Sequence, residues 1–259
     1  MRTVARALTI AGSDSGGGAG IQADLKAFAA AGVHGQSVLV AVTAQSTVGV
    51  TAIHELPAEL VVQQLDAAFS DIGVDAAKTG MLFSSTLIET VASFLQGRDV
   101  PLVVDPVMVA SSGAQLLEVD AVDALVQRLF PLATVVTPNL MEARALAGAD
   151  GTRRELAERL HALGAAAVVV KGGHGDPAVD HLFDGHTHVE IPVERYDIAA
   201  THGAGCTHSA TLAALLARGE SLEEAARGAA AAACRAVAQG LVELGSGDGP
   251  VDVLGVRSR

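Results

Sequence analysis

The 259-residue chain contains no tryptophan, a single tyrosine and only two cysteines. Cys206 and Cys234 are too few for a disulfide framework, and such scarcity is typical of a reducing compartment. Basic residues are also few, with 17 Lys and Arg against 29 Asp and Glu and a formal net charge of -12. We therefore expect neither nucleic acid nor a membrane surface as a partner. A local basic site for a phosphate group is compatible with this balance.

Long apolar runs are equally lacking. The short apolar segment that follows Arg2 and Arg6 ends at Gly12, which is too short for a signal peptide, and charges interrupt the alanine-rich segment near the C-terminus. We therefore expect a cytoplasmic protein. No Pro- or Ser-rich linker and no internal repeat divides the sequence, so residues 1–259 are predicted to form one domain.

Two common nucleotide-binding motifs are also missing. Residues 18–23 formally fit the dinucleotide fingerprint, but no acidic residue lies between Asp24 and Glu55, where the ribose-binding acid belongs. No Walker A motif occurs either. Any ATP chemistry in this chain is therefore not of the P-loop kind.

What the sequence does contain is an alternation of strand and helix patterns. Apolar runs that end in polar or glycine-rich turns predict strands at 7–11, 37–42, 75–81, 101–104, 133–137 and 166–170, an extended edge segment at 48–56 and a hairpin of 179–183 with 188–193. Helical spacing and capping signals predict helices from residue 21, over 57–71, 84–96 and 119–130, from 138–139, from Thr152 with Glu155, after the glycine loop at 201–210, and over 221–244. This alternation is typical of an α/β fold with a mostly parallel sheet covered on both faces.

Polar side chains follow several of these strands at the points where the strands end. They are Asp14, Gln45, Asp105, Asn139 and Lys171. Because open parallel sheets bind ligands at the carboxyl ends of their strands, we expect these side chains to share one site.

A glycine-rich loop at 201–210 leads directly into an apolar helical run. Gly203 and Gly205 would let backbone N–H groups approach an anion, and the N-terminal end of a helix favours negative charge. The same dipole predicts a lowered pKa for the thiol of Cys206. A plain glycine-rich turn, with Cys206 as a small buried hydrophobic side chain, fits the same spacing.

Three further residues are candidates for phosphate chemistry, each with an ordinary structural alternative. Asp105 and Glu142 are candidate ligands of a hydrated Mg²⁺, which takes only one or two carboxylates. Asp105 also fits a turn before a proline, and Glu142 also fits a helix capping box with Asn139. Lys171 fits either a phosphate contact or a plain strand end. Six histidines from His174 to His208 lack the spacing of a zinc site.

Seven segments carry a family resemblance, in order, over nearly the whole chain. They are AGSDSGGGAGIQADLK at 11–26, VTAQST at 42–47, KTGML at 78–82, VDPVM at 104–108, TPNLME at 137–142, KGGH at 171–174 and THGAGCT at 201–207. Together they resemble the hydroxymethylpyrimidine/phosphomethylpyrimidine kinases of thiamine biosynthesis, which have a ribokinase-like fold. The resemblance implies two successive phosphoryl transfers from ATP to an aminopyrimidine, a need for Mg²⁺, and a homodimer.

The resemblance also implies roles for individual residues. On the pyrimidine side, Gln45 would bind the aminopyrimidine edge, Asp24 would lie near the hydroxymethyl group, and Met81 and Val107 would form apolar walls. On the phosphate side, the set comprises Lys171 and Asn139 for ATP, Asp105 and Glu142 for Mg²⁺, and Gly203, Gly205 and Cys206 for the anion hole. Cys206 would also act as the base in the first transfer.

Three departures from the family pattern are visible, and other functions stay open. Ala204 stands where Thr is usual, His208 replaces an apolar residue, and Ser15-Gly16 stands where Pro-Ser is common. A pyridoxal or pyridoxine kinase shares the fold and the loop. A sugar or nucleoside kinase would usually carry Asp at position 206. A non-catalytic vitamin-binding protein is the alternative from a different class.

Overall fold

One sheet organises the residues that the computed structural model describes, which are 4–109, 113–118, 121–173 and 175–257. Its strands are β1 (Arg6–Asp14), β2 (His34–Ser46), β3 (Gly49–Glu55), β4 (Ala76–Thr79), β5 (Leu102–Val104), β6 (Val135–Val136), β7 (Val168–Val170), β8 (Val179–Phe183) and β9 (His188–Pro192). They lie in the order β3-β2-β1-β4-β5-β6-β7-β8-β9. The six central strands are parallel. At one edge β3 pairs antiparallel with β2, and at the other β8 pairs antiparallel with both β7 and β9. The predicted edge segment and hairpin are thus confirmed.

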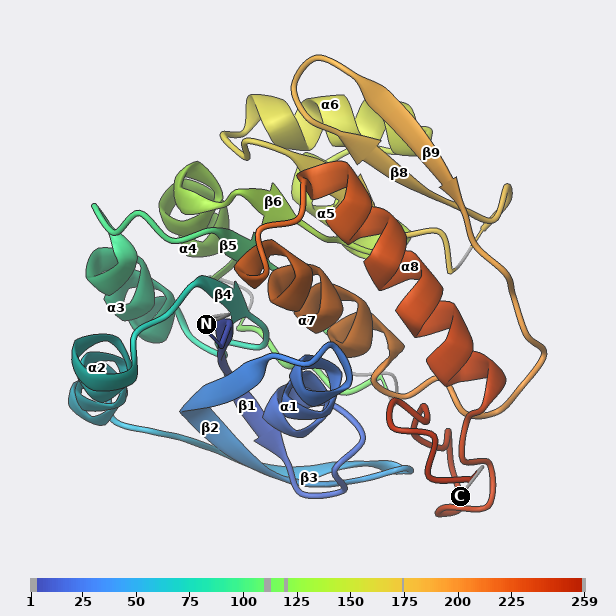
Figure 1. The fold of residues 1–259 in the computed structure, drawn as a ribbon, viewed down its shortest axis with the longest axis horizontal. Coiled ribbons are helices and arrows are strands. Elements are labelled where there is room, and N and C mark those ends of the chain that lie inside the picture. Colours follow the sequence, from blue (N-terminus) through green and yellow to red (C-terminus); the bar gives the residue numbers. More distant parts are fainter. Residues whose placement is uncertain (1–3, 110–112, 119–120, 174, 258–259) are drawn as a thin grey trace.

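Helices cover both faces of this sheet (Figure 1). They are α1 (Gly20–Ala30), α2 (Ala58–Ala67), α3 (Ser85–Leu95), α4 (Ala121–Ala124), α5 (Leu140–Ala147), α6 (Arg153–Ala162), α7 (Ala204–Ala217) and α8 (Leu222–Ala238). One core packs α1, α7 and α8 on the sheet, and a second packs α2 to α6 on the opposite face. Val103 belongs to the first core and Val104 to the second, because successive side chains of a strand point to opposite faces. The predicted α/β class is confirmed.

Local capping signals set the start of several helices. Thr152 and Glu155 form a reciprocal capping box at α6, and Ser221 and Glu224 form another at α8. Each hydroxyl accepts from the backbone N–H three residues on, and each glutamate accepts from the backbone N–H of the capping residue. Both helix starts agree with the sequence prediction.

Other boundaries differ from the prediction. The helix expected over 57–71 ends at Ala67 and continues as a π-helical turn, Ala68–Ile72. The helix expected over 119–130 consists of α4, a π-helical turn and a 3₁₀ turn, and its first two residues lie outside the described part, as does His174. The last helix stops at Ala238, and the N–H of Leu241 then donates to the carbonyl of Pro250.

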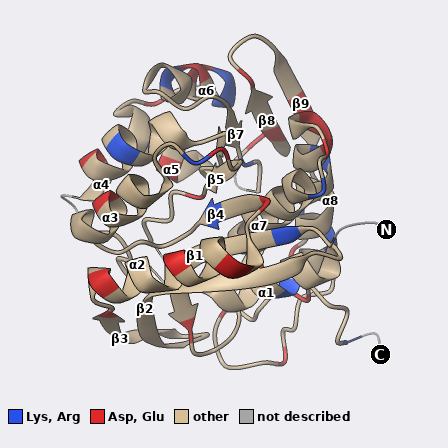
Figure 2. Ribbon diagram, turned by 60° about the vertical axis from the view of Figure 1, so that its left-hand side comes forward, with Lys and Arg blue, Asp and Glu red and all other residues tan. Residues whose placement is uncertain are grey.

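Most charged residues lie on the outer helices, and a few lie inside the molecule near the ends of central strands (Figure 2). Among the described residues, no helix is long and apolar enough to cross a membrane.

Candidate active site

The parallel strands bring two of the polar strand-end residues, Asp105 and Lys171, into contact. Asp105 follows β5, Lys171 follows β7, and the Lys171 ammonium lies 2.8 Å from Oδ1 of Asp105. The same ammonium nitrogen would lie 3.4 Å from a Cβ placed on Gly205, at the start of α7. A lysine therefore sits directly beside the glycine loop, at the carboxyl edge of the sheet.

The loop at the start of α7 has the geometry of an anion site. Gly203 adopts a positive φ of 85°, and a Cβ there would lie 1.9 Å from the carbonyl oxygen of Gly18. Only glycine fits this position. Within the described residues, the backbone N–H groups of Gly205 and Cys206 donate to no protein acceptor. These N–H groups, at the positive end of the helix dipole beside Lys171, are available to an anion.

The predicted lowering of the Cys206 pKa is wrong. Burial raises the pKa of this thiol to about 11, and the charge of Lys78 only partly opposes the effect of burial. The carboxylates of Asp24 and Asp105 raise it further, while a hydrogen bond from the backbone N–H of Gly20 favours the thiolate. The helix dipole is thus outweighed by desolvation and by two nearby negative charges. In the free protein the thiol is protonated at neutral pH.

Asp24 forms a buried ion pair with Lys78, a residue to which the sequence analysis assigned no role. Both carboxylate oxygens of Asp24 lie 2.9 Å from the Lys78 ammonium, and the Thr9 hydroxyl donates to one of them at 2.6 Å. Both charged side chains are fully buried. Burial alone would lower the pKa of Lys78, but the nearby carboxylates raise it, so Lys78 is charged. The Asp24 carboxylate is thus enclosed and faces Lys78, and its expected place near a substrate hydroxymethyl group stays a prediction.

Asp105 and Glu142 have opposite electrostatic properties. Burial would raise the pKa of Asp105, but Lys171 and Lys78 outweigh it and lower the pKa. Burial raises the pKa of Glu142 to about 7, and Asp105 adds to this effect against the opposing charge of Lys171. Glu142 also completes a capping box, since its Oε2 accepts from the N–H of Asn139 at 2.8 Å. The capping interpretation of Asn139 and Glu142 is thus correct, and it leaves Glu142 buried beside the other carboxylate.

The two carboxylates fit a hydrated magnesium ion. Among the described residues, no group of three or more His, Cys, Asp or Glu side chains is placed to hold a metal by itself. A Mg²⁺ ion keeps several waters and needs only one or two carboxylates. Burial is the main cause of the raised pKa of Glu142, and the nearby charge of Asp105 adds to it. A divalent cation would offset both effects.

Two of the residues predicted to contact a pyrimidine, Met81 and Val107, belong to one small apolar cluster. Met81 is buried there with Ala41 and Leu116, and Val107 packs against them. A Cβ on Gly12 would lie 2.5 Å from the terminal carbon of Met81, so the glycine makes room for this side chain. Half-buried Gln45, on β2, accepts a hydrogen bond at its Oε1 from the hydroxyl of Thr43 at 3.2 Å.

A second contact that the sequence analysis missed joins the two glycine loops. Nε2 of His202 lies 3.0 Å from Oδ2 of Asp14, and both side chains are largely buried. Asp14 also accepts from the backbone N–H groups of Gly16, Gly18 and Ala19 at 2.8–3.0 Å. Burial raises the pKa of Asp14, but these hydrogen bonds and His202 outweigh it and lower the pKa. Only the strand-end position of Asp14 hinted at this contact.

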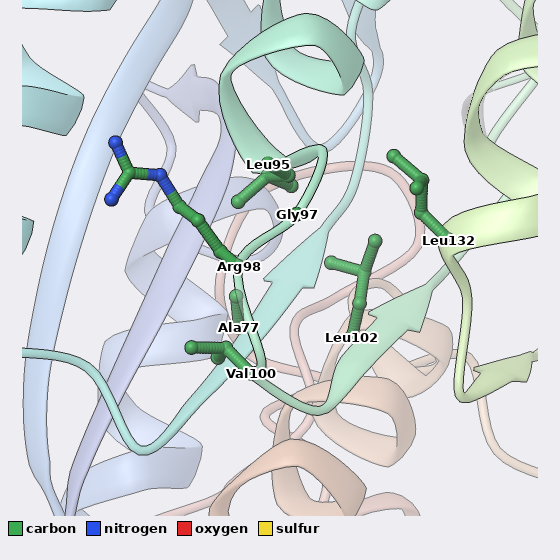
Figure 3. Close-up of a pocket in the computed structure, with 7 residues that line it drawn as sticks. All are labelled: Ala77, Leu95, Gly97, Arg98, Val100, Leu102 and Leu132. Carbon is green, nitrogen blue, oxygen red and sulfur yellow. The ribbon is translucent and has the colours of Figure 1, made fainter.

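A small apolar pocket at the opposite edge of the sheet does not compete with this site. It lies by the starts of β4 and β5, with Leu102 and Leu132 in its wall (Figure 3). Its volume of about 50 Å³ leaves room for a few water molecules at most.

Comparisons with known proteins point to one family. The sequence profile of the phosphomethylpyrimidine kinase family matches residues 14–252. A hydroxymethylpyrimidine/phosphomethylpyrimidine kinase of Rhizobium meliloti is 52% identical over 95% of each chain. Among solved structures, an ADP complex of Bacillus subtilis pyridoxal kinase superposes with a TM-score of 0.90 at 38% identity, covering 99% of this chain and 100% of that one. A phosphomethylpyrimidine kinase of Clostridium difficile superposes with a TM-score of 0.78 at 38% identity, covering 88% of this chain and 97% of that one.

Proposed function

The chain belongs to the phosphomethylpyrimidine kinase family, and from this membership we propose that it phosphorylates 4-amino-5-hydroxymethyl-2-methylpyrimidine in thiamine biosynthesis. ATP supplies a first phosphoryl group to the hydroxymethyl oxygen and a second one to the resulting monophosphate. The observation that carries the proposal is the Lys171 ammonium beside the open N-terminal end of α7, where a transferred phosphoryl group finds both positive charge and backbone donors.

The chain's own groups stabilise the charge that moves during transfer. The N–H groups of Gly205 and Cys206 donate to the migrating phosphoryl oxygens, and Gly203 allows the loop to turn toward them. Loss of one such donor costs about 2.7–4 kcal/mol in comparable sites. Lys171 binds the ATP phosphates, and Asp105 keeps its ammonium oriented. Asn139, at the start of α5, is the further ATP contact.

Asp105 and Glu142 would hold a hydrated Mg²⁺ beside these phosphates. When bound, the ion neutralises part of the phosphate charge. Glu142, with a pKa raised to about 7 in the free protein, favours its ionised form once a cation is near.

The pyrimidine lies on the other side of the loop in this proposal. Gln45 offers a donor and an acceptor to the aminopyrimidine edge, and Met81 and Val107 supply apolar walls. Cys206, in its minor thiolate form, takes the proton of the substrate hydroxyl in the first transfer. The second acceptor is already an anion and needs no base. Lys78 and Asp24 form a fully buried ion pair, and the charge of Lys78 acts on the Cys206 thiol.

The test is ADP release with Mg-ATP and, separately, hydroxymethylpyrimidine, its monophosphate and pyridoxal. Turnover of both pyrimidines with little turnover of pyridoxal supports the proposal. Turnover of pyridoxal alone contradicts it and removes the assigned role of Gln45. Ligand binding without any turnover would support a non-catalytic vitamin-binding protein.

Pyridoxal kinase is the second candidate because a solved pyridoxal kinase superposes over nearly the whole chain. A Gln45→Leu variant separates the two functions. It removes the hydrogen bonds to the aminopyrimidine edge, so kcat/KM for the pyrimidine falls while weak turnover of pyridoxal is retained.

The oligomeric state and location are further parts of the proposal. We expect a homodimer in the cytoplasm, as in the family that the sequence resembles. Sedimentation velocity at micromolar protein concentration tests the first point, and a monomer mass would contradict it.

A further inference from the structure

The glycine turn that carries Lys171 is tied to helix α7 at two points, and both ties run through a buried carboxylate. Lys171 itself contacts Oδ1 of Asp105, whose Oδ2 accepts from the Ser209 hydroxyl at 2.9 Å. The next residue, Gly172, donates its backbone N–H to Oδ1 of Asp180 at 2.6 Å. Oδ2 of Asp180 in turn lies 2.9 Å from Nε2 of His208.

The two ties begin at adjacent residues of α7, shortly after the anion loop. Ser209 acts on the Lys171 side chain through one carboxylate, and His208 acts on the backbone beside Lys171 through the other. Asp180 lies on β8, so this tie also joins the antiparallel edge of the sheet to the helix. These contacts fix Lys171 relative to the start of α7, where the N–H groups of Gly205 and Cys206 are available to an anion.

His208 is costly at its position, which argues for a role other than packing. The side chain is buried on α7, a helix whose buried residues from Ala210 onward are mostly apolar. Its Nδ1 has no hydrogen-bond partner in the described structure. A buried polar atom without a partner destabilises the folded state, and an apolar side chain would avoid that cost. We therefore look for the role of this histidine in the contact that it makes, from Nε2 to Asp180.

We propose that His208, acting through Asp180 and Gly172, is a positioning residue. It holds the turn of Lys171 at the distance from the loop at 203–205 at which both can bind the phosphates of ATP. The inference rests on the proposed function for the assignment of ATP to Lys171. The tight packing of the turn supports it, because a Cβ on Gly172 would lie 2.1 Å from the carbonyl oxygen of Val179. The turn therefore has no room to shift toward β8, and the Asp180 carboxylate holds its backbone N–H at Gly172.

The test compares His208→Leu with His208→Gln. Leucine fills the space without a donor to Asp180, whereas the glutamine amide restores a donor near the position of Nε2. For His208→Leu we expect KM for ATP to rise about tenfold or more, since small misplacements of a binding group have large effects. KM for the pyrimidine should change less than about twofold. His208→Gln should recover most of the ATP affinity.

A matched control is His181→Ala. His181 is also buried on β8, next to Asp180 in sequence, but its Nε2 contacts His188 rather than the Lys171 turn. We expect its KM for ATP to equal that of the unmodified chain. Asp180→Ala should weaken ATP at least as much as His208→Leu, and the double variant should be no worse than Asp180→Ala alone, because both act through one contact.

Calorimetric titration with a non-hydrolysable ATP analogue separates this inference from the proposed function. If the unmodified chain turns over neither pyrimidine, the proposed function fails. The Kd of the analogue still tests whether the contact of His208 with Asp180 supports binding at Lys171. An unchanged Kd in His208→Leu overturns the inference. So does a parallel loss of affinity for ATP and pyrimidine, or a His208→Gln variant no better than leucine. If His208→Leu does not fold, as judged by circular dichroism, the comparison of His208→Gln with Asp180→Ala decides in the same way.

Discussion

At the scale of the residue, the thiol of Cys206 constrains the mechanism most. With a pKa of about 11, only about one thiol in ten thousand is ionised at pH 7. If this thiolate takes the hydroxyl proton, kcat/KM of the first transfer should rise about tenfold per pH unit between pH 7 and 9, because the deprotonated form increases toward the raised pKa. The second transfer, to an anionic acceptor, should stay nearly flat. Initial rates of both steps across this range provide the measurement.

Removal of the thiol gives a second check on the same residue. Cys206→Ala should lower the first transfer by about 10²- to 10⁴-fold, the range for loss of a general base, and the second transfer much less. Cys234→Ala is the matched control, since this cysteine is half-buried on α8 and its thiol donates to the carbonyl of Glu194. Equal losses in both transfers would reject a base role for Cys206.

The buried pair of Lys78 and Asp24 allows a prediction about stability. Lys78→Met leaves the Asp24 carboxylate enclosed without its counter-charge, and the free energy of unfolding should fall by about 3–5 kcal/mol. Adding Asp24→Asn removes the uncompensated charge and should recover part of that loss. Urea unfolding of the two variants measures both effects. A loss below about 1 kcal/mol in Lys78→Met would show that the pair does not matter to the fold.

At the scale of the element, the start of α7 depends on the close approach of two loops. Gly203 and Gly219, which flank this helix, have almost the same φ, 85° and 84°, but only Gly203 faces a nearby atom, the Gly18 carbonyl oxygen. Alanine at either position costs about 1–2 kcal/mol for the left-handed backbone. Gly203→Ala must also displace the first glycine loop, so we expect kcat/KM to fall at least 10²-fold there and to stay unchanged in Gly219→Ala. Urea unfolding and steady-state kinetics test both variants, and equal kinetics would contradict the argument.

The elements that the sequence predicted well are those whose signals are local. The capping box of Thr152 and Glu155 depends on only four consecutive residues, and the structure contains it as predicted. The full length of β2 was not predictable in this way. This strand begins at His34, where β1 pairs with it, and extends to Ser46, where β3 pairs with it. Both pairings are properties of the sheet and not of the segment.

At the scale of the whole molecule, the site could be located from the sequence but its electrostatics could not. Strand ends share an edge in a parallel sheet, so the sequence predicted that Asp105 and Lys171 lie at the same edge, but their direct contact depends on the strand order β5-β6-β7. The pairing of Asp24 with Lys78 spans 54 positions and depends on β4 lying beside β1. The raised pKa of Cys206 likewise depends on that pair and on burial, which no segment encodes by itself.

The concentration of buried charge at one edge implies that the free protein gives up stability for its site, and Glu142 makes this testable. Its pKa is about 7 in the folded chain against an ordinary value of 4.5, so the fold binds this proton more tightly than the unfolded chain. The associated stability is complete below about pH 4.5 and is lost as the pH rises through about 7. Glu142→Gln keeps an oxygen for the Asn139 cap and carries no charge, so it should gain about 1–3 kcal/mol at pH 8 and little at pH 4.

Glu155→Gln is the matched control, because Glu155 has the same place in the capping box of α6 but is exposed, and hydrogen bonds from Thr152 lower its pKa. Its ionised form is favoured by folding, so this variant should gain nothing at pH 8. Urea unfolding at both pH values gives the comparison, and Mg-ATP turnover should fall only in Glu142→Gln. An equal stability change at pH 4 and pH 8 would mean that ionisation of Glu142 does not destabilise the folded chain. A gain confined to pH 8, together with lost turnover, would mean that the fold keeps a buried carboxylate that only a bound cation makes favourable.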